Sequence, residues 1–377
     1  MNFKKNKKIL FITSEFPPGP GGIGNHAWNL AQNLNKSVQL DVLTISDYID
    51  KNDAEAFDSE SDLNIFRFKR YPFHLLTLLH RIYQIVKSVL LNKYTHCILS
   101  GYFSIFMSPM IKFINIRLRI IGVLHGSELL QTNSFLILWV KFSLKTLTSI
   151  ISVSNYTKGL LPFQVSKKQK NIVIPNGVNN KIKLYSIESN QKISFRGSPC
   201  LLTVGSISHR KGQINLVHAL PKIKLFFPDV HYHCVGLPFD KGNIVKIAKK
   251  LNVLENISFH GFIENNKLAS IYKQADILIM LSQNKIESSA EGFGIAILEA
   301  NLFGVPTIGS IKTGIEDAVE NNKTGILVDP YSSVEIIDAM KLILDNHGYY
   351  GERAKDWASK HSWENIADKY LKVIFNG

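Results

Sequence analysis

Short apolar runs alternate along this chain with longer stretches in which apolar residues recur at helical spacing. In the first half, glycine-rich or polar turns follow the runs, and each turn leads into a helical pattern. Because parallel strands need a crossover connection, usually a helix, this alternation predicts a parallel sheet covered by helices on both faces. The runs expected to form strands in this half are Ile9–Ser14, Val38–Ile45, Leu63–Phe68, Thr95–Ser100, Leu118–Leu124, Ser149–Ser154 and Ile172–Ile174.

The second half repeats the pattern after a polar stretch without clear periodicity. Its predicted strands are Cys200–Gly205, His231–Val235, Asn256–His260, Asp276–Leu281, Thr307–Ile308 and Gly325–Val328. We therefore expect an α/β protein with two Rossmann-like parallel-sheet domains that face a central cleft. The expected boundaries are residues 1–175 for the first domain, 176–199 for the linker and 200–360 for the second domain. Residues 361–377 are expected to form a C-terminal helix that packs back toward the first domain.

Two segments of the first half depart from the plain alternation. The acidic segment Ser46–Asp62 is interpreted as a mobile loop between two strands. The segment Phe73–Tyr94 has polar residues at helical spacing among leucines, isoleucines and aromatic residues, which predicts a basic amphipathic helix. Such a helix either packs against the sheet or rests on an anionic lipid surface, and the sequence leaves both readings open.

Composition narrows the class of protein. The chain has 377 residues, of which 45% are hydrophobic and 20% charged, so it is long enough for two folded domains and is not disordered. Its three cysteines lie in apolar runs without metal-ligand spacing, which indicates a reducing compartment and argues against structural zinc. Neither a secretion signal nor an apolar run of spanning length is evident, so we expect a soluble protein.

Positive charge is concentrated in the first domain. Between residues 63 and 175 there are 15 Lys or Arg residues and a single acidic residue, Glu128. The basic residues are spread singly among apolar residues and lack the clustered arginines and interleaved aromatics of a nucleic-acid surface. A field of this sign favours an anionic partner such as a membrane surface, and we expect no nucleic acid.

The stretch from Ser282 to Gly304 combines the end of an apolar run, a polar loop with Gly292 and Gly294, and the start of a helical pattern. The first turn of a helix has unpaired N–H groups and the positive end of the helix dipole, so it favours a phosphate. Glu291 lies before the helix and Glu299 inside it, which gives these carboxylates different neighbours. Taken alone the stretch is ambiguous, since glutamates near helix starts often serve only as caps.

A second candidate anion site follows the first strand of the second half. Arg210 and Lys211 lie between the predicted strand and the next helical pattern, where a guanidinium and an ammonium suit two adjacent phosphates. No pair of acidic residues follows a strand in the manner of a metal-dependent diphosphate site, so we expect no metal. His125, at the end of another predicted strand, is either a packed residue or a group that contacts a bound sugar.

Several motifs together resemble those of a known family. EGFGIAILEA resembles the E-x7-E region of the retaining glycosyltransferases of family 4, also called glycosyl transferases group 1. PPGPGGIGNHAWNLA resembles the glycine loop of that family, and HGSE resembles its histidine motif. Further segments match in the same order along both halves, namely SNYTKGL, VIPNGV, LLTVGSISHRKG, ISFHGFI, VPTIGSIKTGIEDAVENNKTGILVDP and SWENIADKY.

The resemblance implies a GT-B fold and roles for individual residues. Arg210 and Lys211 would hold the donor diphosphate, with help from backbone at Gly22, Gly294 and Ile295. Glu299 would bind the ribose, and backbone near Ile263 would bind the base. Glu291 would bind the hydroxyls of the donor sugar, and His125 would contact that sugar near the reacting carbon, so these two are the expected catalytic residues.

The activity implied is transfer of a sugar from a UDP- or GDP-sugar to a lipid-linked or growing glycan, with retention of configuration and without cofactor or metal. The expected setting is assembly of a surface polysaccharide, such as O-antigen, capsule or exopolysaccharide. There the enzyme would lie at the cytoplasmic face of the cell membrane and contact anionic lipid through its first domain. The alternatives are a nucleotide-sugar 2-epimerase, which shares the GT-B fold, and a non-enzymatic basic binding protein.

Overall fold

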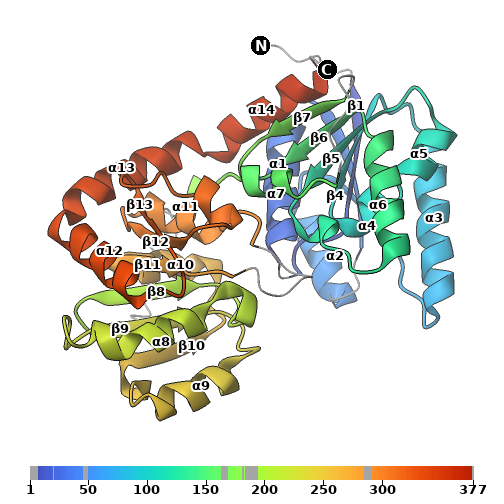
Figure 1. Cartoon of the computed structure of the whole chain (residues 1–377). Helices are drawn as coiled ribbons and strands as arrows, with labels where there is room; N and C mark the ends of the chain where they lie inside the picture. Colours follow the sequence, from blue (N-terminus) through green and yellow to red (C-terminus); the bar gives the residue numbers. More distant parts are fainter. Residues whose placement is uncertain are drawn as a thin grey trace. The chain divides into compact units, whose positions relative to one another are not determined.

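The computed structural model describes residues 7–19, 21–45, 50–162, 169–180, 182, 194–283 and 291–375. The chain divides into two compact units (Figure 1). Unit 1 comprises Met1–Asn176 together with Trp363–Gly377, and unit 2 comprises Gly177–Ser362. Each unit is built on one parallel sheet, so the predicted α/β class with two parallel-sheet domains is confirmed.

Unit 1 contains a seven-stranded sheet in the order β3-β2-β1-β4-β5-β6-β7. Its strands are β1 (Lys8–Thr13), β2 (Gln39–Thr44), β3 (Asn64–Arg67), β4 (His96–Ser100), β5 (Arg119–Leu124), β6 (Ser149–Ser152) and β7 (Lys170–Val173). All neighbouring pairs are parallel, with Ile12 of β1 opposite Leu43 of β2 and Leu99 of β4. The strand order turns back between β1 and β4, and ligands of doubly wound sheets bind outside the carboxyl ends of the strands at such a point.

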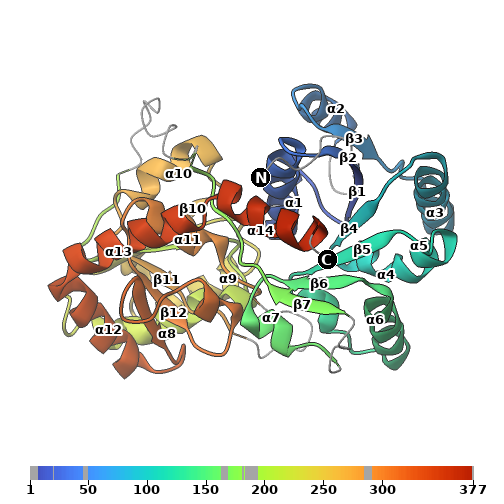
Figure 2. The same ribbon diagram turned by 90° about the horizontal axis from the view of Figure 1, so that it is seen from above.

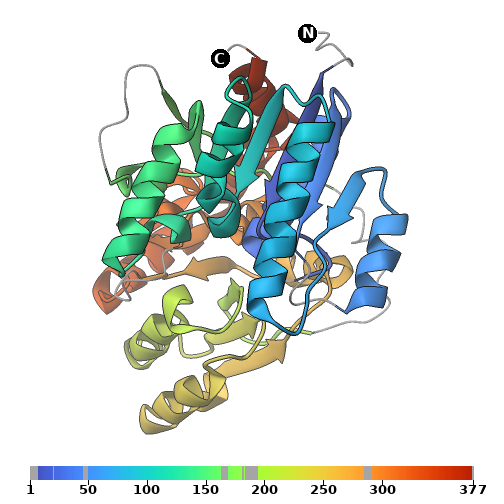
Figure 3. The same ribbon diagram turned by 90° about the vertical axis from the view of Figure 1, so that its right-hand side faces the viewer.

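Helices cover both faces of this sheet (Figure 2). One face carries α1 (Gly22–Asn35) and α14 (Trp363–Phe375), which contact each other although the sequence places them at opposite ends of the chain. The other face carries α3 (His74–Leu91), α4 (Tyr102–Phe106), α5 (Ser108–Ile114) and α6 (Ser134–Thr146), as Figure 3 also shows. The remaining short helices are α2 (Lys51–Ser59), η1 (Ser127–Leu129) and α7 (Asn155–Gly159).

The acidic segment after β2 is not the loop that its composition indicated. Residues Lys51–Ser59 form α2, and the side chain of Asp50 caps this helix by accepting a hydrogen bond from the Asn52 N–H. Residues 46–49 lie outside the described part of the chain. An N-cap aspartate and an acidic first turn both stabilise a helix start. The acidic residues that suggested a solvated loop in the sequence therefore stabilise a helix in the structure.

Unit 2 contains a six-stranded sheet in the order β10-β9-β8-β11-β12-β13. Its strands are β8 (Cys200–Val204), β9 (His231–Val235), β10 (Ile257–Gly261), β11 (Ile277–Met280), β12 (Thr307–Ser310) and β13 (Gly325–Val328). Its α-helices are α8 (Gln213–Ile223), α9 (Lys241–Lys250), α10 (Asn265–Tyr272), α11 (Ile295–Leu302), α12 (Ser333–Asp345) and α13 (His347–Lys360). Here the order turns back between β8 and β11, which makes their carboxyl ends the expected ligand site of this unit.

The cores explain why the apolar runs were strong predictors. Strands β4, β6, β9 and β11 are buried along their whole length, as expected for parallel strands with helices on both faces. One core cluster in unit 1 includes Leu10, Ile12 and Leu99, and one in unit 2 includes Leu201, Tyr232 and Ile279. Burial of such side chains stabilises each by roughly 1.5–3 kcal/mol relative to exposure, and it fixes which strand ends meet at the ligand edge.

Candidate active site

In unit 2, two cations lie between β8 and α8. Arg210 and Lys211 belong to η3 (His209–Lys211), and Gly212 follows them with φ +71°. A Cβ atom at Gly212 would lie 1.8 Å from the carbonyl oxygen of Leu281, so this position tolerates only glycine. This close backbone approach brings the two cations next to the end of β11.

Glu291 lies against both cations. Its Oε2 atom accepts a hydrogen bond from the Arg210 guanidinium and forms an ion pair with the Lys211 Nζ atom at 2.7 Å. Burial would raise the pKa of Glu291, but Lys211 and Arg210 outweigh it and hold the pKa below its usual range. The carboxylate is therefore ionised at neutral pH. It balances only one of the two positive charges, which leaves the cluster complementary to an anion.

The helix that follows, α11, begins at a glycine. Gly294 is the N-cap of α11 and has φ +90°, a conformation that glycine adopts without strain. Among the described residues no side chain caps this helix, and its first turn has no acidic residue, so no carboxylate of that turn competes for the N–H groups at Ile295 and beyond. The start of α11 therefore has the backbone geometry that was predicted for a phosphate contact.

Glu299 lies within α11 and faces a tyrosine. The Tyr272 hydroxyl donates a hydrogen bond of 2.7 Å to the Oε2 atom of Glu299. Burial raises the pKa of Glu299, although Tyr272 and then Lys211 act in the opposite direction. Ile263, the residue proposed to lie beside a base, is buried shortly after β10. Tyr272 was not identified from the sequence, where it is one apolar position of a helical pattern.

In unit 1, the glycine loop leads from β1 into α1. Gly22 is the first residue of α1, and a Cβ atom there would meet nothing within 4 Å, so this backbone is open to a ligand. A Cβ atom at Gly21 would lie 2.4 Å from the Glu15 Oε2 atom, which places this carboxylate at the helix start. Burial raises the pKa of Glu15, and a hydrogen bond from the Gly24 N–H partly offsets that rise. Sequence patterns gave no signal for Glu15.

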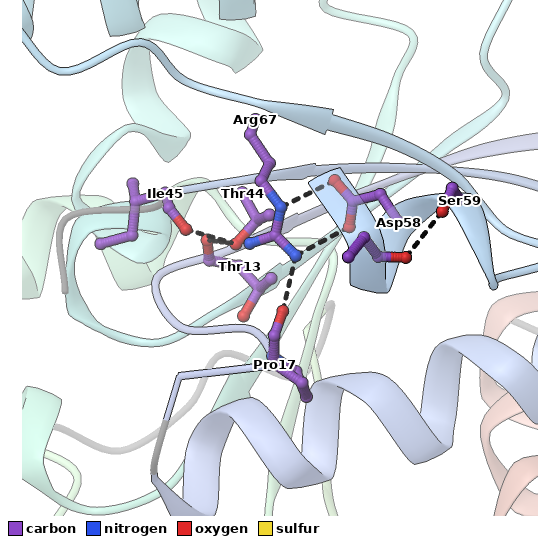
Figure 4. Close-up of polar contacts among 8 residues, drawn as sticks. Thr13, Pro17, Thr44, Ile45, Asp58, Ser59 and Arg67 are labelled. Atoms are coloured by element: carbon purple, nitrogen blue, oxygen red, sulfur yellow. Dashed lines mark hydrogen bonds and ion pairs between the residues drawn. The ribbon is translucent and has the colours of Figure 1, made fainter. Parts of the chain in front are cut away.

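An arginine fixes the first part of this loop (Figure 4). The Arg67 guanidinium donates two hydrogen bonds of 2.8 Å to the Asp58 carboxylate, one from Nε and one from Nη2. The same Nη2 atom donates to the Pro17 carbonyl oxygen at 2.5 Å. Bidentate pairing of this kind restricts both side chains, so α2 and β3 together hold the loop that ends at Gly22.

His125 follows β5 and is partly exposed. Its Nε2 atom lies 3.0 Å from the hydroxyl oxygen of Ser100, the last residue of β4. The Glu128 carboxylate accepts hydrogen bonds from the backbone N–H groups of His125 and Gly126, at 3.0 and 2.9 Å. Burial lowers the pKa of His125 to about 4, so the ring is neutral near pH 7. Burial also raises the pKa of Glu128 to about 7, and the nearby Glu15 adds to that rise.

The predicted site residues thus fall into separate groups within the two units. In unit 2, Arg210, Lys211 and Glu291 form one cluster beside the start of α11. In unit 1, Gly22 and His125 lie at the carboxyl ends of β1 and β5, on the same edge of the sheet. Within the described ranges, no group of three or more His, Cys, Asp or Glu side chains is arranged to hold a metal ion. The described helices include none that is long and apolar enough to cross a membrane.

Comparison with known protein families gives two matches that together span most of the chain. Residues 20–181 match the family described as Glycosyltransferase Family 4, and residues 186–361 match the family described as Glycosyl transferases group 1.

Similar sequences extend over the full length. The chain is 26% identical to an uncharacterized glycosyltransferase of Methanocaldococcus jannaschii, with 97% of each protein covered. It is 24% identical to a GDP-mannose-dependent alpha-(1-6)-phosphatidylinositol monomannoside mannosyltransferase of Mycobacterium tuberculosis, over 97% of this chain and 98% of that protein.

Solved structures share the fold at lower identity. Sucrose-phosphate synthase from Thermosynechococcus elongatus has a TM-score of 0.77 at 20% identity, with 98% of each chain covered. HepE from Anabaena, solved in complex with UDP and glucose, has a TM-score of 0.75 at 18% identity and covers 99% of this chain and 100% of its own.

Proposed function

This chain belongs to glycosyltransferase family 4 and is a glycosyltransferase of the GT-B type, and on that premise we propose its donor, acceptor and stereochemistry. The protein transfers a hexose from a UDP- or GDP-sugar to a lipid-linked or growing glycan with retention of anomeric configuration. The observation that carries the proposal is the cluster of Arg210, Lys211 and Glu291 beside the uncapped start of α11. Excess positive charge beside the N-terminus of a helix is an arrangement that suits a diphosphate.

The donor diphosphate would replace Glu291 as the partner of the two cations. Because a diphosphate carries more negative charge than one carboxylate, Arg210 and Lys211 gain by the exchange. Glu291 is then free to accept hydrogen bonds from hydroxyls of the donor sugar. Glu299 would accept from the ribose hydroxyls, backbone of Gly294 and Ile295 would donate to the diphosphate, and backbone near Ile263 would contact the base.

In the reaction, the bond between the anomeric carbon and the diphosphate oxygen breaks with its electron pair remaining on the diphosphate. The acceptor hydroxyl oxygen forms the new bond on the same face of the sugar, and its proton passes to a leaving phosphate oxygen. Arg210 and Lys211 stabilise the charge that develops on the departing group, which is where enzymes of this kind gain most rate. The proposal assigns no carboxylate as nucleophile.

The roles of Gly22 and His125 in the same reaction are also proposals. Open backbone at Gly22 supports a contact with the diphosphate. The neutral ring of His125, partly exposed at the end of β5, supports a hydrogen bond to a sugar hydroxyl near the reacting carbon. No protein-bound cofactor takes part in this scheme.

The direct test is a screen of nucleotide sugars, including UDP-glucose and GDP-mannose, for release of nucleoside diphosphate. Wild type should release it from one donor class, and Glu291→Ala should lose at least about tenfold in kcat because a contact made in the transition state is removed. Glu320→Ala is a matched control, since Glu320 forms a surface ion pair with Lys323 in the same unit. Equal turnover by wild type and Glu291→Ala would exclude this site.

Product analysis separates the finer claims. A product sugar with the donor's anomeric configuration, read by NMR, supports retention, whereas the opposite configuration excludes it. Conversion of the nucleotide sugar into its 2-epimer without any acceptor would favour the epimerase alternative instead.

A lipid-linked acceptor is supported by an unusual surface of unit 1. Helix α3 buries Thr77, Ile85 and Val89, yet most of its large apolar side chains point outward. Neighbouring helices add more, because α5 contacts both α3 and α6 (Figure 3). The exposed apolar residues of these helices and of the turn after α5 are Leu75, Leu76, Leu78, Leu79, Tyr83, Leu90, Leu91, Phe113, Ile116, Phe135, Leu138 and Phe142.

Charge supports an anionic membrane as the partner of this apolar surface of α3, α5 and α6. Between residues 63 and 175 the sequence contains one carboxylate, Glu128, and it is fully buried. Lys87 and Lys145 are exposed on α3 and α6, so the surface combines apolar and basic groups. Such a surface fits the interface of an anionic membrane, where apolar side chains enter the acyl boundary and lysines meet phosphate headgroups. We place the enzyme at the cytoplasmic face of the cell membrane, in surface polysaccharide assembly.

Vesicle flotation tests this contact. The full chain should bind phosphatidylglycerol-containing vesicles at low salt and bind phosphatidylcholine vesicles less. Leu79→Ser/Tyr83→Ser should weaken binding, whereas Leu225→Ser/Phe239→Ser, which changes two even more exposed apolar residues of unit 2, should not. Equal binding by both double variants, or no binding by wild type, would remove the membrane contact and leave the transferase assignment intact.

A further inference from the structure

A second histidine lies directly behind His125. His26, on α1, is fully buried, and its ring meets the His125 ring edge to face with 4.8 Å between the ring centres. Burial, and then repulsion from His125, lowers the pKa of His26 well below its ordinary value. The buried ring of His26 is therefore neutral, and the partly exposed ring of His125 packs against it.

The C-terminal helix fixes His26 from the other side. The Tyr370 hydroxyl oxygen lies 3.3 Å from the His26 Nε2 atom, and Trp363 packs edge to face on the same ring with 5.2 Å between ring centres. Both residues belong to α14, which contacts α1. The Nδ1 atom of His26 is buried without a hydrogen-bond partner among the described residues, so Tyr370 provides the orienting hydrogen bond to this ring.

The other contacts of His125 do not fix the orientation of its ring as this packing contact does. Ser100 hydrogen-bonds to the Nε2 atom of the ring, and Glu128 binds backbone N–H groups. A single hydrogen bond at one edge leaves the ring free to tilt about that contact, whereas the edge-to-face contact with His26 limits the tilt. Ring orientation matters because polar contacts to a reacting sugar lose effect with displacements of about 1 Å.

We propose that His26, held by Tyr370 and Trp363 of the C-terminal helix, is a positioning residue that sets the ring orientation of His125 for the transfer reaction. The C-terminal helix is then part of the catalytic apparatus, acting through two side chains that never touch substrate. This inference rests on the role given to His125 above. It assigns a function to the histidine of the GGIGNHAWNLA segment and to the tyrosine of SWENIADKY.

Tyr370→Phe is the sharpest variant, because it removes only the hydroxyl and retains the packing of α14. We expect kcat to fall about tenfold with the donor KM changed less than about twofold, since ring placement affects the transition state more than donor binding. The matched control is Tyr232→Phe. Its hydroxyl is also buried and hydrogen-bonded, 2.8 Å from the Thr203 hydroxyl oxygen, but it lies in the core of unit 2. This control should lose comparable thermal stability and keep its kcat.

A second readout does not depend on turnover. In the full chain with 15N-labelled histidine, the ring nitrogen signals of His125, assigned with His125→Gln, should shift in Tyr370→Phe and stay fixed in Tyr232→Phe. Unchanged His125 signals together with equal kcat in both variants would show that His26 serves packing alone and would overturn the inference. Failure of the proposed function looks different, because His125→Gln itself would then retain full turnover.

Discussion

Replacing Glu291 by glutamine removes the only carboxylate that pairs with Arg210 and Lys211 in the described part of unit 2. The glutamine side chain has nearly the same shape, so packing at this buried position changes little. Its amide carries no charge, and the two cations then repel each other without a counter-ion. The variant therefore isolates the electrostatic role of this carboxylate.

The magnitude follows from burial. Removal of one partner of a fully buried ion pair costs about 3–5 kcal/mol. The Arg210 side chain remains 30% exposed and that of Lys211 14%, so water screens part of the loss. We take about 2 kcal/mol for the lost free energy of unfolding, which lowers the melting temperature of a unit of this size by about 4–8 °C.

A nucleoside diphosphate should reverse this loss. If Arg210 and Lys211 bind the diphosphate as proposed, UDP or GDP must displace Glu291 from these cations in the wild type, whereas in Glu291→Gln no carboxylate competes for them. We therefore expect saturating UDP or GDP to raise the melting temperature of the variant more than that of the wild type, measured by differential scanning fluorimetry. Turnover of the intact nucleotide sugar should still fall, because the sugar hydroxyls lose their acceptor.

The control for this experiment is Glu320→Gln, which removes a carboxylate from a surface pair with Lys323. It should leave both the melting temperature and the nucleotide response unchanged within about 1 °C, since exposed pairs contribute little. If Glu291→Gln responded to the nucleotide less than the wild type does, Arg210 and Lys211 would not be the diphosphate site.

Three further predictions concern Arg67, His233 and Glu299. Arg67→Lys keeps the charge but loses the bidentate contact with Asp58. It should lower the free energy of unfolding, measured by urea denaturation, by about 1–2 kcal/mol. An unchanged denaturation midpoint would show that the bidentate contact does not stabilise the loop. Burial lowers the pKa of His233 to about 4 from 6.5, so its contribution to stability is complete above pH 6.5 and is lost as the pH falls toward 4. Wild type should therefore lose about 1–2 kcal/mol more than His233→Gln between pH 7 and pH 5, and parallel losses would refute this. Glu299→Gln can still accept the Tyr272 hydrogen bond but should weaken UDP or GDP binding about tenfold by calorimetry, because a charged acceptor for the ribose is gone; unaltered affinity would exclude that role.

The outline of both sheets was predictable because parallel strands buried on both faces need nearly continuous apolar runs. Ile9–Ser14 and Asp276–Leu281 are examples, since β1 (Lys8–Thr13) and β11 (Ile277–Met280) begin and end within one residue of these limits. The helix α2 was missed for the opposite reason. Its sequence is polar, and a polar stretch reads as a loop unless capping by Asp50 and the contact of Asp58 with Arg67 are known.

The individual site residues were predicted from motifs, but their partners were not. Glu291 and the two cations are about eighty positions apart in the sequence. They meet because the backbone of Gly212, which follows the cations, packs closely against Leu281 at the end of β11. Tyr272, Glu15 and His26 look like ordinary members of helices and turns in the sequence. Their roles depend on which side chains face them, and periodicity alone does not specify that.

The sequence by itself determined the fold class, the family and the strand ends at which polar groups gather. These features follow from the spacing of apolar residues and from the order of motifs, and both can be seen along the chain without knowledge of its contacts. Only the tertiary structure decided that Glu291 neutralises one of two cations, that α3 turns its leucines outward, and that the last helix reaches a buried histidine behind His125. These relations join segments far apart in sequence. Their energies come from burial and charge at contacts that exist only once the units have folded.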